Sequence, residues 1–571
     1  MQHDEFKPPP KKALRVKVNI PYQDDLSHPD ILTIPCLDRP VPEVLGALFK
    51  QWCHRQAIII SAPTGAQKTT YMLKIAKYAK AHRQHVLFLA HRRLIVEQQK
   101  GIMVNSLGSR WADVKDNLAL ELTSEFRDCN LTMMSYQAFA FRCKEMDLSK
   151  FDYVICDEVH YFATDALFSE TADELLNQIP QLFAKAVRIY MSATPEAVLE
   201  DIVRVEKAAQ KRPCNRACWR EGCDKLLLYR FPNHFEGLQL RYFKEPAEIA
   251  DLAKSHPGEK FLVFVSHREG FDEANPNTYL AAFKQANISV SYLDRDEKNS
   301  ATWNNLRDNQ RFETQALVTT SVTDCGVNIM DKNLKHIVIE TTDRTELIQM
   351  LGRRRRDRNE PVSVYIRAIN SGTMHHRLRK TEEWLEICER ADRSSARHPD
   401  YKLLLKGWND CSADHPYSKL LVPYSSGGFR VKRTAYHALL WQQGTLKKLI
   451  RMSEKYGDNS ALPRLVHEWL ETPDGYREEN WLHYDAQQKA REELVQFLQQ
   501  WLDVPLNDEN EESFKQELRE LLSPLVMGAH DSTREIGYRA LNNRLEDLEL
   551  PYQIVKKGSG YCVEQTNKNI N

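Results

Sequence analysis

Short apolar runs alternate with helix-like segments between residues 45 and 370. The first set of runs is Ile58–Ile60, Val86–Leu89, Tyr153–Cys156 and Val187–Met191. The second set is Phe261–Val265, Ile288–Tyr292, Ala316–Thr319, His336–Ile339 and Val362–Ile366. Continuous apolar runs separated by helices are typical of parallel strands that are covered on both faces. The pattern therefore predicts an α/β fold with two parallel-sheet lobes in tandem.

The pattern changes beyond Arg367. Ala490, Leu494, Leu498 and Trp501 recur at helical spacing. This spacing predicts a mainly helical C-terminal region.

The last segment predicts a helix and a hairpin. The helix starts at the capping box Ser532–Glu535 and runs to Leu548, and the hairpin has a basic tip. Two interpretations remain open: a winged-helix module, or a helix and hairpin that cap the helical region. In the first, the side chains that face a duplex are Arg534, Arg539, Asn542, Arg544, Lys556 and Lys557.

Composition narrows the class of protein. The 571 residues include 79 Lys plus Arg and 79 Asp plus Glu, so affinity for nucleic acid must come from local patches. The sequence has no apolar run long enough to cross a membrane and no hydrophobic signal core at its start. We therefore expect a cytoplasmic monomer with reduced cysteines.

The segment Ala62–Thr70, APTGAQKTT, lies between a predicted strand and a predicted helix. Backbone N–H groups at the helix start, together with the charge of Lys68, face an anion in such a loop, and Thr69 is placed to ligate Mg²⁺. The predicted ATP-binding residues here are Ala62, Thr64, Gly65, Ala66, Gln67, Lys68, Thr69 and Thr70.

Gln67 stands where such loops usually have glycine. A non-glycine residue costs about 1–2 kcal/mol if its φ is positive, although the side chain could also simply point outward. Active hydrolysis is favoured over a binding-only site because the charged groups of the site are present.

Asp157 and Glu158 follow the buried run Tyr153–Cys156. Carboxylates at the carboxyl end of a parallel strand point into the crevice where ligands bind. We expect Asp157 to hold Mg²⁺, largely through its water shell, and Glu158 to orient and deprotonate the attacking water. The alternative is an Asp-Glu pair that caps the following helix.

Five segments in order resemble the motifs of superfamily 2 helicases. They are 62–69 (motif I), 157–160 (II), 192–194 (III), 320–328 (V) and 349–356 (VI). The DEVH spelling of motif II is similar to the DEAH-like side of the superfamily. The resemblance implies two RecA-like lobes, with ATP and Mg²⁺ bound between them. The expected divisions are an N-terminal extension (1–40), lobe 1 (41–232), lobe 2 (233–370), a helical accessory domain (371–529) and the winged-helix candidate (530–571).

The resemblance also implies roles for motifs V and VI. Gly326 and Asn328 would contact the nucleotide, and Gln349 would place the water. Arg353 and Arg356 would reach the γ-phosphate, where an inserted arginine is worth roughly 10³–10⁵ in rate. The implied catalytic set is Lys68, Asp157, Glu158, Gln349, Arg353 and Arg356. Arg354 and Arg355 fit either a solvated face or a nucleic-acid patch.

Nucleic acid would cross the tops of both lobes in this family. The matching positions are Arg92 and Arg93 (motif Ia), Thr132–Gln137, Arg268 (motif IV) and Thr320. Contacts of this kind to the phosphate backbone give affinity without sequence preference. The alternative for each arginine is an ordinary surface position at a strand tip.

Three cysteines in a polar connector follow motif III. Cys214, Cys218 and Cys223 have the spacing C-x₃-C-x₄-C, and His234 lies downstream. A zinc or iron–sulfur site and free surface thiols are both open interpretations.

Together these patterns predict an ATP-dependent helicase or translocase. The winged-helix candidate favours DNA over RNA as its substrate. The alternatives are an ATPase switch that clamps nucleic acid and recruits a protein partner, and a nucleotide-binding scaffold disabled by Gln67.

Overall fold

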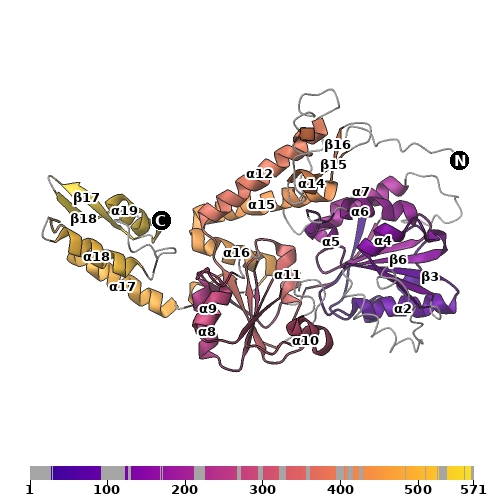
Figure 1. Ribbon diagram of the computed structural model, residues 1–571, viewed down its shortest axis with the longest axis horizontal. Helices are drawn as coiled ribbons and strands as arrows, with labels where there is room; N and C mark the ends of the chain where they lie inside the picture. The colour runs from indigo at the N-terminus through magenta and orange to yellow at the C-terminus, as the bar shows by residue number, and fades with distance from the viewer. Residues whose placement is uncertain are drawn as a thin grey trace.

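The structure is a computed structural model of the chain. It describes residues 28, 30–91, 123–126, 130–167, 169, 171–210, 226–233, 235–265, 272–293, 300–320, 329–354, 360–393, 404–406, 408, 416–423, 428–472, 474–482, 484–507, 510–523, 525, 537–548, 550–557 and 560–566. Two sheet-based lobes, a pair of long helices that reaches both of them, and a small C-terminal domain make up the fold (Figure 1). No helix of the described residues is both long enough and apolar enough to cross a membrane.

Lobe 1 is built on an eight-stranded sheet with the order β1-β8-β2-β7-β6-β3-β5-β4. Its strands are β1 (Ile31–Pro35), β2 (Ala57–Ser61), β3 (His85–Ala90), β4 (Thr123–Phe126), β5 (Leu131–Ser135), β6 (Phe151–Asp157), β7 (Val187–Ser192) and β8 (Leu226–Arg230). Every pairing is parallel except β4 with β5 at the edge. The central strands are buried along their whole length because helices cover both faces.

Two helical layers enclose this sheet. One apolar core lies under α1 (Val41–Val44) and α2 (Lys68–Ala81). The other lies under α4 (Tyr136–Arg142), α5 (Tyr161–Thr164), α6 (Ala172–Leu182) and α7 (Leu199–Gln210). The carboxyl ends of β2, β6 and β7 are thereby left to carry motifs I, II and III.

Lobe 2 repeats this plan with a six-stranded parallel sheet of order β11-β12-β10-β13-β14-β9. Its strands are β9 (Leu238–Phe243), β10 (Lys260–Phe264), β11 (Val290–Leu293), β12 (Ala316–Thr319), β13 (Leu334–Ile339) and β14 (Val362–Arg367). Its helices are α8 (Pro246–Ser255), α9 (Tyr279–Gln285), α10 (Ala301–Asn309) and α11 (Arg344–Leu351). The predicted pair of parallel-sheet lobes is confirmed.

Two long antiparallel helices, α12 (Ser371–Arg393) and α15 (Arg433–Tyr456), form what we call the arm (Figure 1). The carboxyl half of α15 packs with α16 (Asp458–Leu470) into the core of lobe 2. The amino half packs beside Ala166 of lobe 1, next to α14 (Pro416–Leu420), β15 (Leu421–Pro423) and β16 (Phe429–Val431). One helix therefore touches both lobes.

Polar contacts hold the amino half of α15 to lobe 1. The Asp173 carboxylate accepts from the Thr434 backbone N–H at 3.1 Å and forms an ion pair with Arg430. Asp201 Oδ2 lies 2.9 Å from His437 Nδ1. Both carboxylates are almost fully buried, at 2% and 1% exposed.

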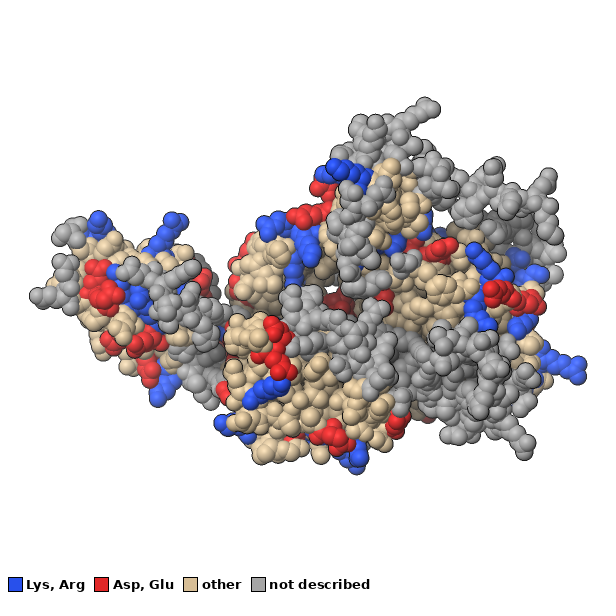
Figure 2. Space-filling view, viewed as in Figure 1, with Lys and Arg blue, Asp and Glu red and all other residues tan. Residues whose placement is uncertain are grey.

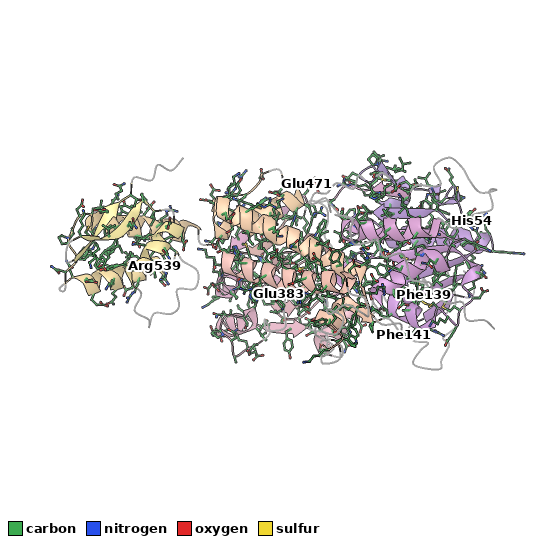
Figure 3. All side chains as sticks on the ribbon, turned by 90° about the horizontal axis from the view of Figure 1, so that it is seen from above. His54, Phe139, Phe141, Glu383, Glu471 and Arg539 are labelled. Carbon is green, nitrogen blue, oxygen red and sulfur yellow. The ribbon has the colours of Figure 1, made fainter. Side chains whose placement is uncertain are left out.

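The C-terminal domain lies beside lobe 2 and away from lobe 1 in both views (Figures 1 and 3). It contains α17 (Tyr484–Gln500), α18 (Glu511–Leu522), α19 (Tyr538–Asp547) and the hairpin β17 (Tyr552–Lys557) and β18 (Gly560–Gln565). These elements share one apolar core. Leu502 and Leu506, between α17 and α18, bridge to β18. Three helices and a hairpin therefore form one small domain with its own core.

Two of the predicted duplex contacts are engaged inside this domain. The Asn542 side chain donates to Ile554 O at 2.9 Å and accepts from Ile554 N–H at 2.8 Å, so it fastens α19 to β17 and does not face a duplex. Lys557 pairs with Glu564 and, at 3.5 Å, with Asp503. Residues 532–536 lie outside the described residues, and the face in Figure 2 shows basic and acidic side chains interspersed on this domain.

Candidate ATP site between the lobes

The phosphate-binding loop joins β2 to α2. Gly65 (φ 91°) and Gln67 (φ 61°) both have left-handed backbone conformations. Gln67 therefore has the positive φ that strains a non-glycine residue, at a cost of about 1–2 kcal/mol relative to glycine. Lys68 is the first residue of α2, and its ammonium donates to Ala62 O at 2.9 Å and Pro63 O at 3.3 Å. The cation is thus held over the loop.

Motif II places two carboxylates at the end of β6. Asp157 is 5% exposed, and Glu158 has a φ of 50°. Left-handed residues other than glycine are often found at functional sites. Burial opposes ionisation of Glu158, but the charge of Lys68, followed by His160 and Arg353, lowers the pKa of Glu158 below its ordinary value. Glu158 is therefore an ionised carboxylate surrounded by cationic groups.

Motif III is tied to motif II by short polar contacts. His160 Nδ1 lies 3.1 Å from Ser192 Oγ and 3.3 Å from Glu158 Oε2. Ser192 Oγ in turn accepts from the Thr194 N–H at 3.0 Å. The ends of β6 and β7 are thus held in register beside the loop.

Lobe 2 supplies groups to the same cleft through α11 and the turn that follows it. Arg353 is 4% exposed and donates to Gln349 Oε1 at 2.9 Å. The charge of Arg353 also contributes to lowering the pKa of Glu158 in lobe 1. Arg344, at the start of α11, lies 3.9 Å from Glu196 of lobe 1.

Gly352 of lobe 2 lies against the phosphate-binding loop of lobe 1. A Cβ built on Gly352 would lie 2.6 Å from Oγ1, 2.8 Å from Cβ and 2.9 Å from Cγ2 of Thr64 in the phosphate-binding loop. Only glycine allows this approach, which brings motif VI against motif I.

The donor set of the cleft fits a triphosphate. Thr64 Oγ1, Thr194 Oγ1 and Gln349 Nε2 are buried, and none has a hydrogen-bond partner among the described residues. Buried polar atoms are normally paired, so these three atoms indicate a polar ligand in the cleft. Thr69 and Asp157 would hold Mg²⁺ together with phosphate oxygens and water. No group of three or more His, Cys, Asp or Glu among the described residues could hold a metal by itself.

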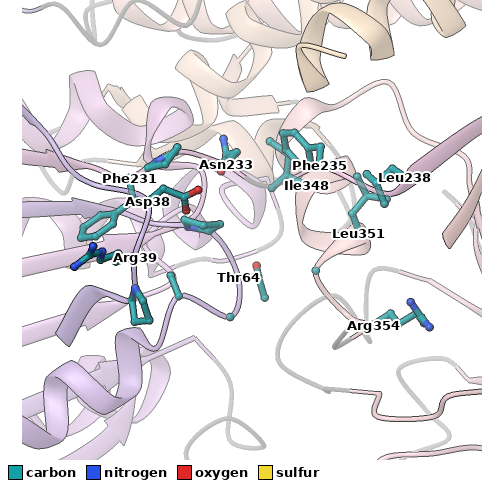
Figure 4. Close-up of a pocket in the computed structure, with 16 residues that line it drawn as sticks. Asp38, Arg39, Thr64, Phe231, Asn233, Phe235, Leu238, Ile348, Leu351 and Arg354 are labelled. Carbon is teal, nitrogen blue, oxygen red and sulfur yellow. The ribbon is translucent and has the colours of Figure 1, made fainter. Parts of the chain in front are cut away.

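A cavity of about 370 Å³ opens beside the phosphate-binding loop (Figure 4). The residues that line it include Asp38, Arg39, Phe231, Phe235 and, from α11, Leu351. Apolar walls next to a phosphate site suit a nucleobase. Sequence reasoning missed these residues, because they belong to none of the recognised motifs and meet only after both lobes fold.

The other predicted positions have different outcomes. Arg354 is buried, and its guanidinium donates to Glu360 at 2.5 Å, so it belongs to neither a solvated face nor a nucleic-acid patch. Thr320 directly follows β12. The positions that lie outside the described residues are Arg92, Arg93, Cys214, Cys218, Cys223, His234, Arg268, Gly326, Asn328, Arg355 and Arg356.

Two protein-family models match the two lobes. The model described as type III restriction enzyme, res subunit, matches residues 42–197, and the helicase conserved C-terminal domain matches residues 244–358. The chain is a superfamily 2 helicase. The helicase hydrolyses ATP and acts on nucleic acid. No curated protein matches its sequence.

Solved structures with some similarity to this helicase include S. cerevisiae Dbp5 bound to RNA and ADP BeF3, at 13% identity, covering 55% of this chain and 79% of that one, with a TM-score of 0.39. The DUF1998 helicase MrfA bound to DNA is 13% identical, covering 67% and 59%, with a TM-score of 0.41. Mycobacterium smegmatis helicase Lhr bound to ssDNA and AMP-PNP is 14% identical, covering 66% and 56%, with a TM-score of 0.38. These similarities are too distant to carry an argument about this helicase.

Proposed function

We propose that this helicase is an ATP-driven translocase that moves along DNA. The observation that carries the proposal is the packing of Gly352 in motif VI of lobe 2 against Thr64 in the phosphate-binding loop of lobe 1, which brings the two motifs to one site. A site assembled from two lobes changes when they separate, so hydrolysis can be linked to movement between them.

Each group has a role in phosphoryl transfer. Lys68 would bind the β- and γ-phosphates, and Glu158 would accept the proton of the attacking water that Gln349 positions. Arg353, with Arg356, would offset the charge that develops on the transferred phosphoryl group. Thr69 and Asp157 would hold Mg²⁺, whose charge would offset that of the phosphates.

Two observations support DNA as the track. The family model that matches lobe 1 is named for a restriction-enzyme subunit. The C-terminal domain combines three helices with a hairpin, and we assign it as a winged-helix module of the kind that many DNA-binding proteins use. Contacts from Arg92, Arg93, Arg268 and Thr320 to the phosphate backbone would give grip without sequence preference.

A turnover assay tests the proposal. ATP hydrolysis is measured with single- and double-stranded DNA and RNA, and displacement of a third strand from a triplex reports movement along the duplex. We expect DNA to stimulate turnover and drive displacement, and Lys68→Ala to abolish both. Stimulation by RNA alone would refute the DNA assignment, and stimulation without displacement would favour an ATPase clamp.

A further inference from the structure

We infer that Tyr136 is a positioning residue that transmits strand binding to the catalytic end of β6; this inference rests on the proposed nucleic-acid-dependent ATPase. Tyr136 directly follows β5 and begins α4. Its side chain is fully buried, and its hydroxyl donates to the backbone oxygen of Asp157 at 2.8 Å. The end of β5 is thereby fastened to the residue that precedes Glu158.

Stacked rings extend this contact to a third strand end. The rings of Tyr136 and Tyr161 are parallel within 2°, with centroids 5.2 Å apart. His91 directly follows β3, and its ring packs against Tyr161 with the two ring centroids 4.3 Å apart. His91 Nε2 also lies 3.1 Å from Asp165 Oδ2, beyond α5. We call Tyr136, Tyr161 and His91 the aromatic relay.

A side-chain contact closes the relay. Gln137 Nε2 donates to the Tyr161 hydroxyl at 3.2 Å. The resemblance assigns strand contact to Thr132–Gln137, which contains Gln137, and to Arg92, which directly follows His91. Tyr161 directly follows motif II. A shift of either strand-contacting segment therefore moves rings that bear on the Asp157 carbonyl.

The chemistry suits a fixed donor. The Tyr136 hydroxyl is buried with the Asp157 carbonyl within hydrogen-bond distance, so the donor is held in one orientation. Closely packed interiors transmit displacement because they have little free volume to absorb it. The relay reaches β6 through the hydrogen bond from Tyr136 to the Asp157 carbonyl.

Tyr136→Phe removes this hydrogen bond and keeps the ring. A buried hydrogen bond of this kind is worth about fivefold in an equilibrium. We expect the ratio of kcat at saturating single-stranded DNA to kcat without DNA to fall by about fivefold. The KM for ATP should change by less than about twofold, because no group that touches the phosphates is altered.

Tyr190→Phe is the matched control. Tyr190 is equally buried on the neighbouring strand β7, and its hydroxyl donates to Glu206 at 2.6 Å, outside the relay. This variant loses a buried hydrogen bond to a carboxylate, which is stronger than the one that Tyr136 makes to a carbonyl, so it is a stringent control for loss of stability. Its stimulation ratio should equal that of the wild type.

Gln137→Leu tests the second link. If the relay acts as one unit, the double variant Tyr136→Phe, Gln137→Leu lowers the ratio no further than the stronger single variant. Multiplying effects, an unchanged ratio in Tyr136→Phe, or an equal loss in Tyr190→Phe would each overturn the inference. A wild type without DNA stimulation would instead refute the proposed function.

Discussion

Gly352→Ala is expected to weaken closure of the cleft without weakening either lobe. Gly352 has a φ of −71°, so alanine fits its backbone, and in helical conformation alanine is favoured by about 0.5–1 kcal/mol. The added methyl group would lie within 2.9 Å of three atoms of Thr64. Rotation of the short Thr64 side chain exchanges one of these atoms for another, so relief requires the loop or α11 to move.

Overpacking of this kind costs about 1–3 kcal/mol. Since about 1.4 kcal/mol corresponds to a factor of ten, the closed state should be about 5- to 150-fold less populated. We therefore expect kcat/KM for ATP to fall within that range while the Tm stays unchanged or rises slightly. Steady-state turnover and differential scanning fluorimetry measure the two quantities.

Gly372→Ala provides the control for this prediction. Gly372 lies at the start of α12, and its added Cβ would meet nothing closer than Asn370 Oδ1 at 3.4 Å. Its kcat/KM should match that of the wild type. If Gly352→Ala stays within twofold of wild type, or loses Tm instead of turnover, the proposed contact between motif I and motif VI in the working state is wrong.

Three further predictions concern stability and the arm. Gln67→Gly removes the left-handed strain of about 1–2 kcal/mol, so the Tm should rise by about 2–4 °C, and a lower Tm would contradict the strain. Asp173→Asn breaks a buried ion pair, so hydrogen exchange should rise in residues 433–440 more than in 449–456; equal changes would show that Asp173 does not hold the arm. Burial and then Arg464 lower the pKa of His467 from 6.5 to about 4, so only the unfolded chain takes up a proton between these values. Stability should therefore fall as the pH drops from 6.5 to 4, and His467→Gln should flatten the Tm-against-pH curve, whereas an identical curve would rule out His467 as the source.

Much of the lobe architecture follows from local pattern. The runs at Ile58–Ile60 and Val187–Met191 are strands because they are continuously apolar and lie in the centre of a covered sheet. Lys68 and Asp157 could be placed from sequence because each follows such a strand directly. The sequence indicated that Gln67 would be strained if its φ were positive, but only the folded loop gives the sign of that φ.

Contacts between distant segments could not be predicted in this way. The approach of Gly352 to Thr64 depends on how the lobes pack, and no local pattern encodes it. Asn542 is of a residue type that reads bases in DNA, yet its side chain is hydrogen-bonded to the backbone of β17. Strand β8 lies between β1 and β2 although both are far from it in sequence, so the pattern of apolar runs could not indicate its partners.

The two ends of α15 are held by different interactions, apolar contacts with lobe 2 and polar contacts with lobe 1. Leu449 and Ile450 lie in the apolar core of lobe 2, and separating α15 from lobe 2 would expose apolar surface to water. Arg430, Thr434 and His437 meet carboxylates on lobe 1, and water can replace such partners as they part. When the lobes rotate, α15 should move with lobe 2, and its polar contacts with lobe 1 should break first. Whether these contacts are formed therefore depends on the angle between the lobes.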